Sequence, residues 1–305
     1  MYDIIIIGAG AAGMTSALYA LRNGKKVLVL EGESLGGQIA TSPRLENFPS
    51  VKSISGEQFA DNLYEQIDAL GAEVEIEHVT GIEKRGEGDF LVRTEYGAYE
   101  GRSVVIAAGV RHKHLKTKHD REDLLGKGVY YCAVCDGPFY KGREVAVVGD
   151  ANSALQYALL LSGYCTKVYM YTLFDKFFGD ESLVKALRAK ENIEVCPETN
   201  VVDFIGENEL EAVEYTDKDG NLCRREIPAV FVAIGQVPDN AAFANVADLD
   251  EAGYIVADES CKTRTPGVFV AGDCRTKAVR QVSTAVSDGA IAATNASLYL
   301  ESLKA

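Results

Sequence analysis

The feature that most constrains the fold is a strand–turn–helix–strand module that occurs twice in the chain. In the first copy, the apolar run Tyr2–Ile7 ends at the turn Gly8-Ala9-Gly10-Ala11-Ala12-Gly13. A helical pattern follows through Leu21, and a second apolar run, Val27–Leu30, ends on Glu31. Such glycines let the backbone approach a pyrophosphate, and an acid after the second strand accepts hydrogen bonds from a ribose. The alternative is a turn without a ligand, but this context favours a dinucleotide site.

The second copy of the module lies in the middle of the chain. The apolar run Glu144–Val148 leads into the turn Gly149-Asp150-Ala151-Asn152-Ser153-Ala154, a helical pattern covers Leu155–Leu161, and the next apolar run is Lys167–Tyr171. Two such modules predict an α/β fold with two doubly wound, Rossmann-like domains.

Comparing the two copies indicates that the second has lost its ligand. Thr172 stands as far after Gly149 as Glu31 stands after Gly8. The run Thr172-Leu173-Phe174 offers neither an acid for an NAD ribose nor an arginine for an NADP phosphate. Ala151 replaces the second glycine, and Asp150 adds a negative charge where phosphates would lie. We therefore expect the second module to keep the fold without a nicotinamide dinucleotide.

Composition narrows the classes of partner and the compartment. The net charge of −14 argues against nucleic acid and anionic membrane surfaces, which need a basic face. The chain has no run of 18 apolar residues, and no basic segment precedes the N-terminal apolar run, so we expect neither a membrane span nor a signal peptide. Seven cysteines without regular spacing do not form a disulfide framework. A cytoplasmic location is expected.

A C-x-x-C motif carries the candidate chemistry. Cys132 and Cys135 lie just before the first strand of the second module, and Asp136 and Gly137 follow them directly. The motif suits either a redox pair or a zinc site. Zinc would need two further ligands, which the scattered remaining cysteines do not supply as a pair, so no metal is expected. An adjacent carboxylate can carry protons during thiol exchange, which inert core thiols would not need. The other five cysteines are interpreted as small buried hydrophobes.

Along essentially its whole length the chain resembles the low-molecular-weight thioredoxin reductases. The matching stretches are Gly8–Gly13, Leu35-Gly36-Gly37-Gln38, Leu45-Glu46-Asn47-Phe48-Pro49, Cys132–Gly137, Ala271-Gly272-Asp273 and Arg280-Gln281, the last two in a motif that runs through Ala285 and Gly289.

The resemblance implies a fold of the pyridine nucleotide-disulfide oxidoreductase type and a homodimer. A FAD-binding domain would comprise residues 1–115 and 245–305, and an inserted nicotinamide-type domain carrying the dithiol would comprise residues 116–244. The implied FAD-binding residues are Gly8, Gly10, Ala11, Ala12, Gly13, Glu31, Gly32, Gly36, Gly37, Gln38, Thr41, Asn47, Val79, Ala108, Gly109, Gly272, Asp273, Arg280, Gln281 and Val282.

The resemblance also implies catalytic roles. Cys135 would lie against the flavin, Cys132 would attack the disulfide of thioredoxin, and Asp136 would act as acid and base. Asp273 would face the ribityl or phosphate region of FAD. Arg280, Gln281 and Val282 would contact the ring system, and Gln38 and Asn47 would hold the flavin from the other side.

The chain departs from the NADPH-dependent members at one place. Those members carry a G-x-G-x-x-A turn and a His-Arg-Arg run that grips the 2′-phosphate, whereas this chain has the turn that begins at Gly149 and the run Thr172-Leu173-Phe174. The pattern resembles the ferredoxin-dependent flavin thioredoxin reductases. We therefore expect reduced ferredoxin to supply electrons through FAD to the dithiol and on to thioredoxin.

Three alternatives stay open at the sequence level: weak NADPH use through a remodelled turn, a different small reductant or flavoprotein as donor, and a non-catalytic redox-sensing flavoprotein. Ferredoxins are acidic, so a chain of charge −14 would need a local basic patch to dock one. The run from Arg111 to His119 is the densest candidate, with Arg275, Lys277 and Arg280 as another, although a basic run is usually only a solvated loop.

Overall fold

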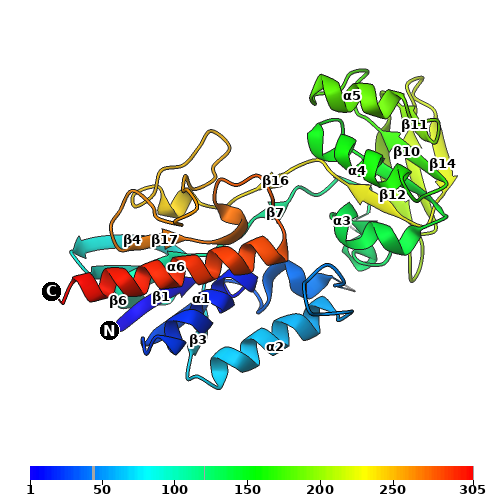
Figure 1. The fold of residues 1–305 in the computed structure, drawn as a ribbon. Coiled ribbons are helices and arrows are strands. Elements are labelled where there is room, and N and C mark those ends of the chain that lie inside the picture. Colours follow the sequence, from blue (N-terminus) through cyan, green and yellow to red (C-terminus); the bar gives the residue numbers. More distant parts are fainter. Residues whose placement is uncertain (43–44, 120, 305) are drawn as a thin grey trace. The chain divides into compact units, whose positions relative to one another are not determined.

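The computed structural model describes residues 1–42, 45–119 and 121–304. The chain divides into two compact units (Figure 1). Unit 1 comprises Met1–Arg111 and Val237–Ala305, and unit 2 comprises His112–Gln236.

The sequence predicted domain boundaries at 115/116 and 244/245. In the structure the boundaries between the two units lie at 111/112 and 236/237. The two chain segments that pass between the units pair with each other there, as the short strands β7 (Arg111–His112) and β16 (Gln236–Val237). Beyond this pairing, Leu115 packs against a hydrophobic cluster of unit 2, and Phe243 is buried in a cluster of unit 1. The side chains that fill each core therefore set the boundaries.

Unit 1 is built on a seven-stranded sheet in the order β3-β2-β1-β6-β5-β4, with β17 also paired to β6. Strands β3, β2, β1, β6 and β17 run parallel, and β4 and β5 add an antiparallel ribbon. The bounds are β1 Tyr2–Ile7, β2 Val27–Glu31, β3 Glu73–Ile76, β4 Val79–Gly86, β5 Asp89–Thr94, β6 Ala98–Ile106 and β17 Val268–Val270. β1 and β2 read as almost unbroken apolar runs because a parallel sheet is covered on both faces.

The helices of unit 1 meet most closely where α6 crosses α1, side by side in Figure 1. Gly289 of α6 makes this approach possible, since a Cβ there would lie 2.3 Å from the carbonyl oxygen of Ala12 in α1. The hydroxyl of Ser16 donates to the Gly289 carbonyl at 3.1 Å. The bounds are α1 Ala11–Arg22, η1 Gly37–Thr41, α2 Gly56–Asp68, η4 Ala241–Phe243, η5 Gly272–Cys274 and α6 Val282–Ser302.

Unit 2 contains a parallel sheet in the order β11-β10-β9-β15-β8 and an antiparallel sheet in the order β12-β13-β14. Its strands are β8 Val129–Tyr130, β9 Glu144–Val148, β10 Lys167–Tyr171, β11 Ile193–Cys196, β12 Asn200–Ile205, β13 Ala212–Thr216, β14 Leu222–Glu226 and β15 Val230–Val232. Its helices are η2 Glu122–Leu124, α3 Ala133–Asp136, η3 Gly137–Tyr140, α4 Asn152–Ser162 and α5 Glu181–Arg188. The second strand–turn–helix–strand module forms β9, α4 and β10, as predicted.

None of the helices in the described ranges is long and apolar enough to cross a membrane.

Candidate active site and cofactor-binding loops

The first and third glycines of the N-terminal turn are needed for close packing. Gly8 has a positive φ of 103°, and a Cβ on it would lie 2.3 Å from the carbonyl oxygen of Ala107. A Cβ on Gly13 would lie 1.8 Å from the Gly8 carbonyl oxygen. The turn and the start of α1 therefore fold against β6 only with glycine at both positions.

Gly10, the second glycine, leaves room above the start of α1. The nearest described atom to a Cβ on Gly10 would be the Gly36 carbonyl oxygen, at 3.8 Å. Gly10 is the N-cap residue of α1 and has no side chain that could accept hydrogen bonds from the first turn. That turn contains no acidic residue. The backbone N–H groups of Ala11, Ala12 and Gly13 therefore remain for an anion, and this cradle fits the pyrophosphate of a dinucleotide.

Glu31 at the end of β2 is fixed beside this turn. Its carboxylate accepts hydrogen bonds from the backbone N–H of Ala9 at 2.6 Å and of Glu33 at 2.9 Å. Gly32 follows, and a Cβ there would lie 2.9 Å from Nδ1 of His78. The acid that was predicted to bind a ribose thus stands at the edge of the glycine turn, held by two backbone donors.

Gly36 and Gly37 close the other side of the turn. Both have positive φ values, 95° and 58°, and the Gly36 N–H donates to the Ala9 carbonyl at 2.9 Å. A Cβ on Gly36 would lie 2.6 Å from Cβ of Ala60. The side chain of Gln38 donates to the carbonyl of Val110.

The C-terminal motif places a buried acid in unit 1. Gly272 has a φ of 82° and opens η5, in which Asp273 has one carboxylate oxygen, Oδ1, buried without a hydrogen-bond partner in the described part of the chain. Burial raises the pKa of Asp273 to about 6. A buried acceptor without a protein donor fits a hydroxyl group of a bound cofactor.

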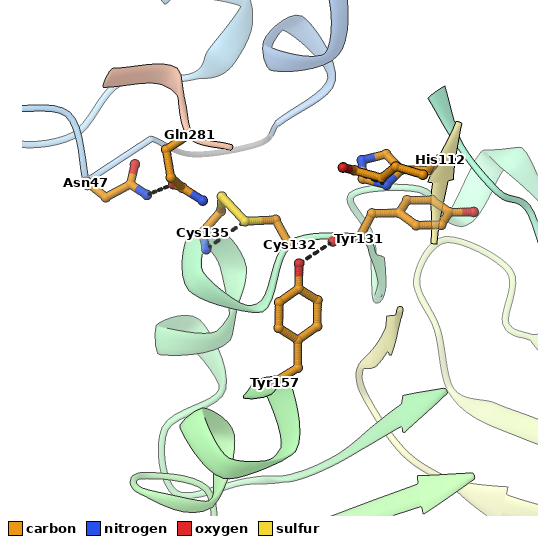
Figure 2. The surroundings of a disulfide bond; sticks show 8 residues. Asn47, His112, Tyr131, Cys132, Cys135, Tyr157 and Gln281 are labelled. Carbon is orange, nitrogen blue, oxygen red and sulfur yellow. Dashed lines mark hydrogen bonds between the residues drawn. A yellow bond between two sulfur atoms is a disulfide. The ribbon is translucent and has the colours of Figure 1, made fainter. Parts of the chain in front are cut away.

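Arg280 and Gln281 lie beside this acid. Arg280 donates from Nε to the Asp273 carbonyl at 3.2 Å, and its guanidinium lies 4.2 Å from the ring centroid of Tyr254. Gln281 caps α6, which begins at Val282, and its Oε1 accepts from Nδ2 of Asn47 at 3.1 Å (Figure 2). The predicted residues Asn47 and Gln281 are therefore brought together from distant parts of the chain.

The remaining predicted cofactor residues are placed as follows. Ala108 and Gly109 follow β6, with Gly109 at a positive φ of 65°, and Val79 is buried at the start of β4. The side chain of Thr41 lies outside the described residues.

The dithiol and Asp136 belong to unit 2. Cys132 and Cys135 are joined by a disulfide with their Cα atoms 5.3 Å apart, and both are half-buried (Figure 2). Cys132 is the N-cap residue of α3, and its Sγ accepts from the Cys135 N–H at 3.2 Å. The short helix therefore holds both sulfurs on one turn.

Asp136, directly after Cys135, is buried with 6% of its surface exposed. Its Oδ1 makes no hydrogen bond within the described ranges, and burial raises its pKa to about 7. A carboxyl group that titrates near neutral pH is suited to accepting and returning a proton beside a thiol.

Unit 2 repeats the backbone of the glycine turn. Gly149, with a φ of 142°, packs against the carbonyl oxygen of Ala233, since a Cβ would lie 2.4 Å from it. Gly8 packs against Ala107 in the same way in unit 1. The Phe178 N–H donates to the Asp150 carbonyl at 2.8 Å, and Phe178 forms a parallel β-bridge with Ala151.

The side chains of this second turn do not suit a nicotinamide dinucleotide. The hydroxyl of Thr172, where the first module has Glu31, donates to the Phe174 carbonyl at 2.8 Å. The rings of Phe174 and Phe178 pack edge to face at 5.3 Å and are both about half exposed. Burial raises the pKa of Asp150. In its charged form this carboxylate would repel a phosphate beside it. The turn therefore lacks the acid or arginine that recognises the ribose or the 2′-phosphate of a nicotinamide dinucleotide.

The structure also identifies Asp288, which the sequence prediction missed, and it contradicts part of the second candidate docking patch. Asp288 in α6 accepts from Arg275 at 2.8 and 2.9 Å, from Lys277 at 2.7 Å and from the Gly272 N–H at 3.1 Å. The side chains of Arg275, Lys277 and Asp288 are all buried. The prediction that Arg275 and Lys277 could form an exposed basic patch for docking is therefore wrong, because both cations are buried as partners of Asp288. Asp288 directly precedes Gly289 in the C-terminal motif, and this position in the motif could have identified Asp288 from the sequence.

The five other cysteines are only partly as predicted. Cys165, Cys261 and Cys274 are buried. Cys196 and Cys223 are half-buried, because β11 and β14, in which they lie, are the outer strands of their sheets. None of the described His, Cys, Asp and Glu residues form a group of three or more that could hold a metal ion.

Comparison with known proteins identifies relatives over the whole chain. The model of the family described as pyridine nucleotide-disulphide oxidoreductase matches residues 2–289. The chain is similar to the thioredoxin reductase of Treponema pallidum, with 38% identity over 99% of this chain and 98% of the relative. It is 36% identical to the thioredoxin reductase of Listeria monocytogenes, over 100% of this chain and 95% of that protein. The crystal structure of thioredoxin reductase from Streptococcus pyogenes matches with a TM-score of 0.94 and 34% identity, covering 99% of each chain.

Proposed function

The chain belongs to the pyridine nucleotide-disulphide oxidoreductase family as a flavoprotein disulfide reductase of the thioredoxin reductase type, and we propose that reduced ferredoxin rather than NADPH is its electron donor. Its cofactor is FAD, and the glycine turn of unit 1 with Glu31 and Asp273 would hold it. When bound, FAD accepts electrons singly and supplies them in pairs to a disulfide.

The observation that carries the choice of donor is the second glycine turn. The run Thr172-Leu173-Phe174 stands where a dinucleotide-binding turn would present an arginine or an acid, and Phe178 packs on Phe174. The half-buried Asp150 carboxylate would repel a phosphate. A donor that delivers electrons without binding to this turn is consistent with these side chains. Two reduced ferredoxins, each carrying one electron, would reduce the Cys132–Cys135 disulfide once.

The dithiol then reduces thioredoxin by two exchanges. The Cys132 thiolate attacks one sulfur of the thioredoxin disulfide and forms a mixed disulfide, and the other thioredoxin sulfur leaves as a thiolate that takes up a proton. Cys135 next attacks Cys132, which restores the Cys132–Cys135 disulfide and releases the second thioredoxin thiolate, which is protonated in turn. The enzyme dithiol loses two electrons and two protons, and thioredoxin gains both.

Asp136 is the group that we propose moves one of these protons. It is adjacent to Cys135 in the chain, buried, and carries a pKa of about 7, so both of its protonation states are populated near neutral pH. The carboxylate would take the proton from Cys135 as that thiol attacks and would return it to a departing thiolate.

A homodimer in the cytoplasm is the state in which we propose that the enzyme works. The relatives from Treponema pallidum and Listeria monocytogenes are thioredoxin reductases of similar length, and a cytoplasm that keeps thiols reduced suits a dithiol that cycles.

The donor is tested on the first half-reaction alone. The anaerobic FAD-loaded enzyme is titrated separately with reduced ferredoxin and with NADPH while the flavin absorbance is recorded. We expect bleaching by ferredoxin at two equivalents per electron pair and none by NADPH on the same timescale. Prompt bleaching by NADPH would overturn the assignment. Failure of both donors would point to another reductant.

A further inference from the structure

A basic loop runs beside the dithiol in unit 2. It spans residues 112–119, and its lysines Lys113, Lys116 and Lys118 are all exposed. We propose that these three lysines form the docking surface for the protein whose disulfide Cys132 attacks, and that they recognise carboxylates on that acceptor. The inference rests on the proposed reduction of thioredoxin but holds whichever donor supplies the electrons.

The backbone of the basic loop is fixed rather than merely solvated. The Lys113 N–H donates to the Gly235 carbonyl at 3.0 Å, and the Lys118 N–H donates to the Val202 carbonyl at 2.8 Å. Between them, Leu115 packs against the hydrophobic cluster of unit 2. A loop held at both ends and in the middle presents its lysines in a constant arrangement, which reduces the entropy lost when a partner binds.

Tyr131 connects the basic loop to the nucleophile. The His112 ring stacks on the Tyr131 ring with centroids 4.5 Å apart (Figure 2). The His114 ring meets the Tyr131 ring edge-on, with centroids 5.6 Å apart. The Tyr131 carbonyl accepts from the hydroxyl of Tyr157 in α4 at 3.1 Å. Tyr131 directly precedes Cys132, so the basic loop packs against the residue next to the nucleophile.

Within the described residues, the three lysines differ from neighbouring arginines and from His119 in forming no ion pair. Arg111 pairs with Glu33, His119 with Asp203, and Arg121 with Asp123. Over the ranges that the structure describes, Lys113, Lys116 and Lys118 form no ion pair. In a chain of net charge −14, three exposed lysines in one short loop would favour the approach of a carboxylate to this part of unit 2.

The acceptor, rather than the donor, is the partner that this position favours. Thiol–disulfide exchange forms a covalent bond between Cys132 and the acceptor, so the acceptor has to touch the surface around Cys132. Electron transfer to a flavin does not require contact with Cys132. Carboxylates near the acceptor's disulfide would meet the lysines and speed the encounter, an effect that salt would weaken.

The test compares the triple variant K113E/K116E/K118E with the matched variant K185E/K190E/K218E. Both change the same charge on unit 2, and all six lysines are exposed. Each FAD-loaded protein is reduced with dithionite, freed of excess reductant and mixed anaerobically with an oxidised bacterial thioredoxin of net negative charge, at low and high salt. Hydroxyethyl disulfide, which is small and uncharged, serves as the second acceptor.

We expect the basic-loop variant to reduce thioredoxin with a second-order rate constant at least about tenfold lower at low salt, with the difference shrinking at high salt. Its rate with hydroxyethyl disulfide, and all rates of the matched variant, should equal those of the wild type. Equal loss in both variants, or no loss in either, overturns the docking surface while leaving the proposed function intact. A wild-type enzyme that reduces hydroxyethyl disulfide but not thioredoxin overturns both.

Discussion

Phe178 occupies in unit 2 the backbone position that Gly36 occupies in unit 1. Each donates its N–H to the carbonyl of the residue after the first turn glycine, Asp150 at 2.8 Å and Ala9 at 2.9 Å. Each also bridges the residue at the start of the following helix, Ala151 or Gly10. The two turns therefore share a backbone arrangement and differ in the side chain at this position, glycine in one and phenylalanine in the other.

The glycine turn predicts a contrast between two alanine variants. Gly10→Ala places its Cβ no closer than 3.8 Å to the described protein atoms, at an ordinary φ of −77°, so the apoprotein should unfold at the wild-type denaturant concentration. Its FAD affinity should fall at least about tenfold, because the methyl group fills the space left for the pyrophosphate.

Gly13→Ala should instead destabilise the apoprotein itself, by about 2 kcal/mol or more, since its Cβ would lie 1.8 Å from the Gly8 carbonyl oxygen. Urea unfolding of both apoproteins and fluorescence titration with FAD measure the two effects. Equal stability of the two variants would contradict this packing argument.

The exchange mechanism predicts which cysteine forms the bond to thioredoxin. Cys135→Ser should leave Cys132 able to attack but unable to be released, so a stable mixed disulfide with thioredoxin accumulates. Cys132→Ser should give none, and both variants should lose all but a background of turnover. Non-reducing electrophoresis and mass spectrometry identify the adduct, and Cys165→Ser, which removes a buried thiol of unit 2, provides the control. An adduct formed through Cys135 would reverse the assigned roles.

We predict that the free energy of unfolding depends on pH through the titration of Asp136. Its pKa is about 7 in the folded protein, above the ordinary value of 3.8, because burial disfavours the charged form. The folded state therefore binds more protons than the unfolded state between about pH 4 and pH 7, and stability falls as pH rises through that window. Asp136→Asn should lack this fall, so that near pH 8 it exceeds the wild type by about 1 to 3 kcal/mol.

The same variant should exchange disulfides with thioredoxin about a hundredfold more slowly, since the proton carrier is lost. Urea unfolding at pH 5 and pH 8 and stopped-flow exchange rates measure the two effects. The exposed Asp123→Asn in the same unit is the control. A gain in stability without a loss of rate would remove Asp136 from the proposed mechanism.

The buried ion cluster around Asp288 predicts a large loss of stability. Asp288→Asn leaves Arg275 and Lys277 buried without a countercharge and weakens the bond to the Gly272 N–H, so we expect a cost of about 3 to 5 kcal/mol in the unfolding of unit 1. Asp248→Asn, which breaks an exposed pair with Arg264, should cost less than about 1 kcal/mol. Comparable losses in the two variants would show that the cluster is not required.

Much of the fold could be predicted from the sequence because its signals are local. The apolar runs that end at Gly8 and at Gly149 mark β1 and β9, and the distance from each to the next run fixes α1 and α4. The ends of the inserted unit could not be placed as well, because they depend on which core buries Leu115 and Phe243.

For the candidate site, residue types predicted the dithiol and its acid but not their surroundings. The stacking of His112 on Tyr131, and the three residues that donate to Asp288, join residues that lie in different elements or loops. Such contacts arise only from tertiary packing, and a single sequence carries no periodic signal for them.

The most direct test of the account is anaerobic thioredoxin reduction by the FAD-loaded enzyme with two donors side by side. In one reaction hydrogenase keeps ferredoxin reduced, and in the other NADPH is supplied at millimolar concentration. We predict continuous formation of thioredoxin thiols with ferredoxin, abolished by Cys132→Ser, and only background formation with NADPH. Turnover with NADPH that equals or exceeds turnover with ferredoxin would contradict the account.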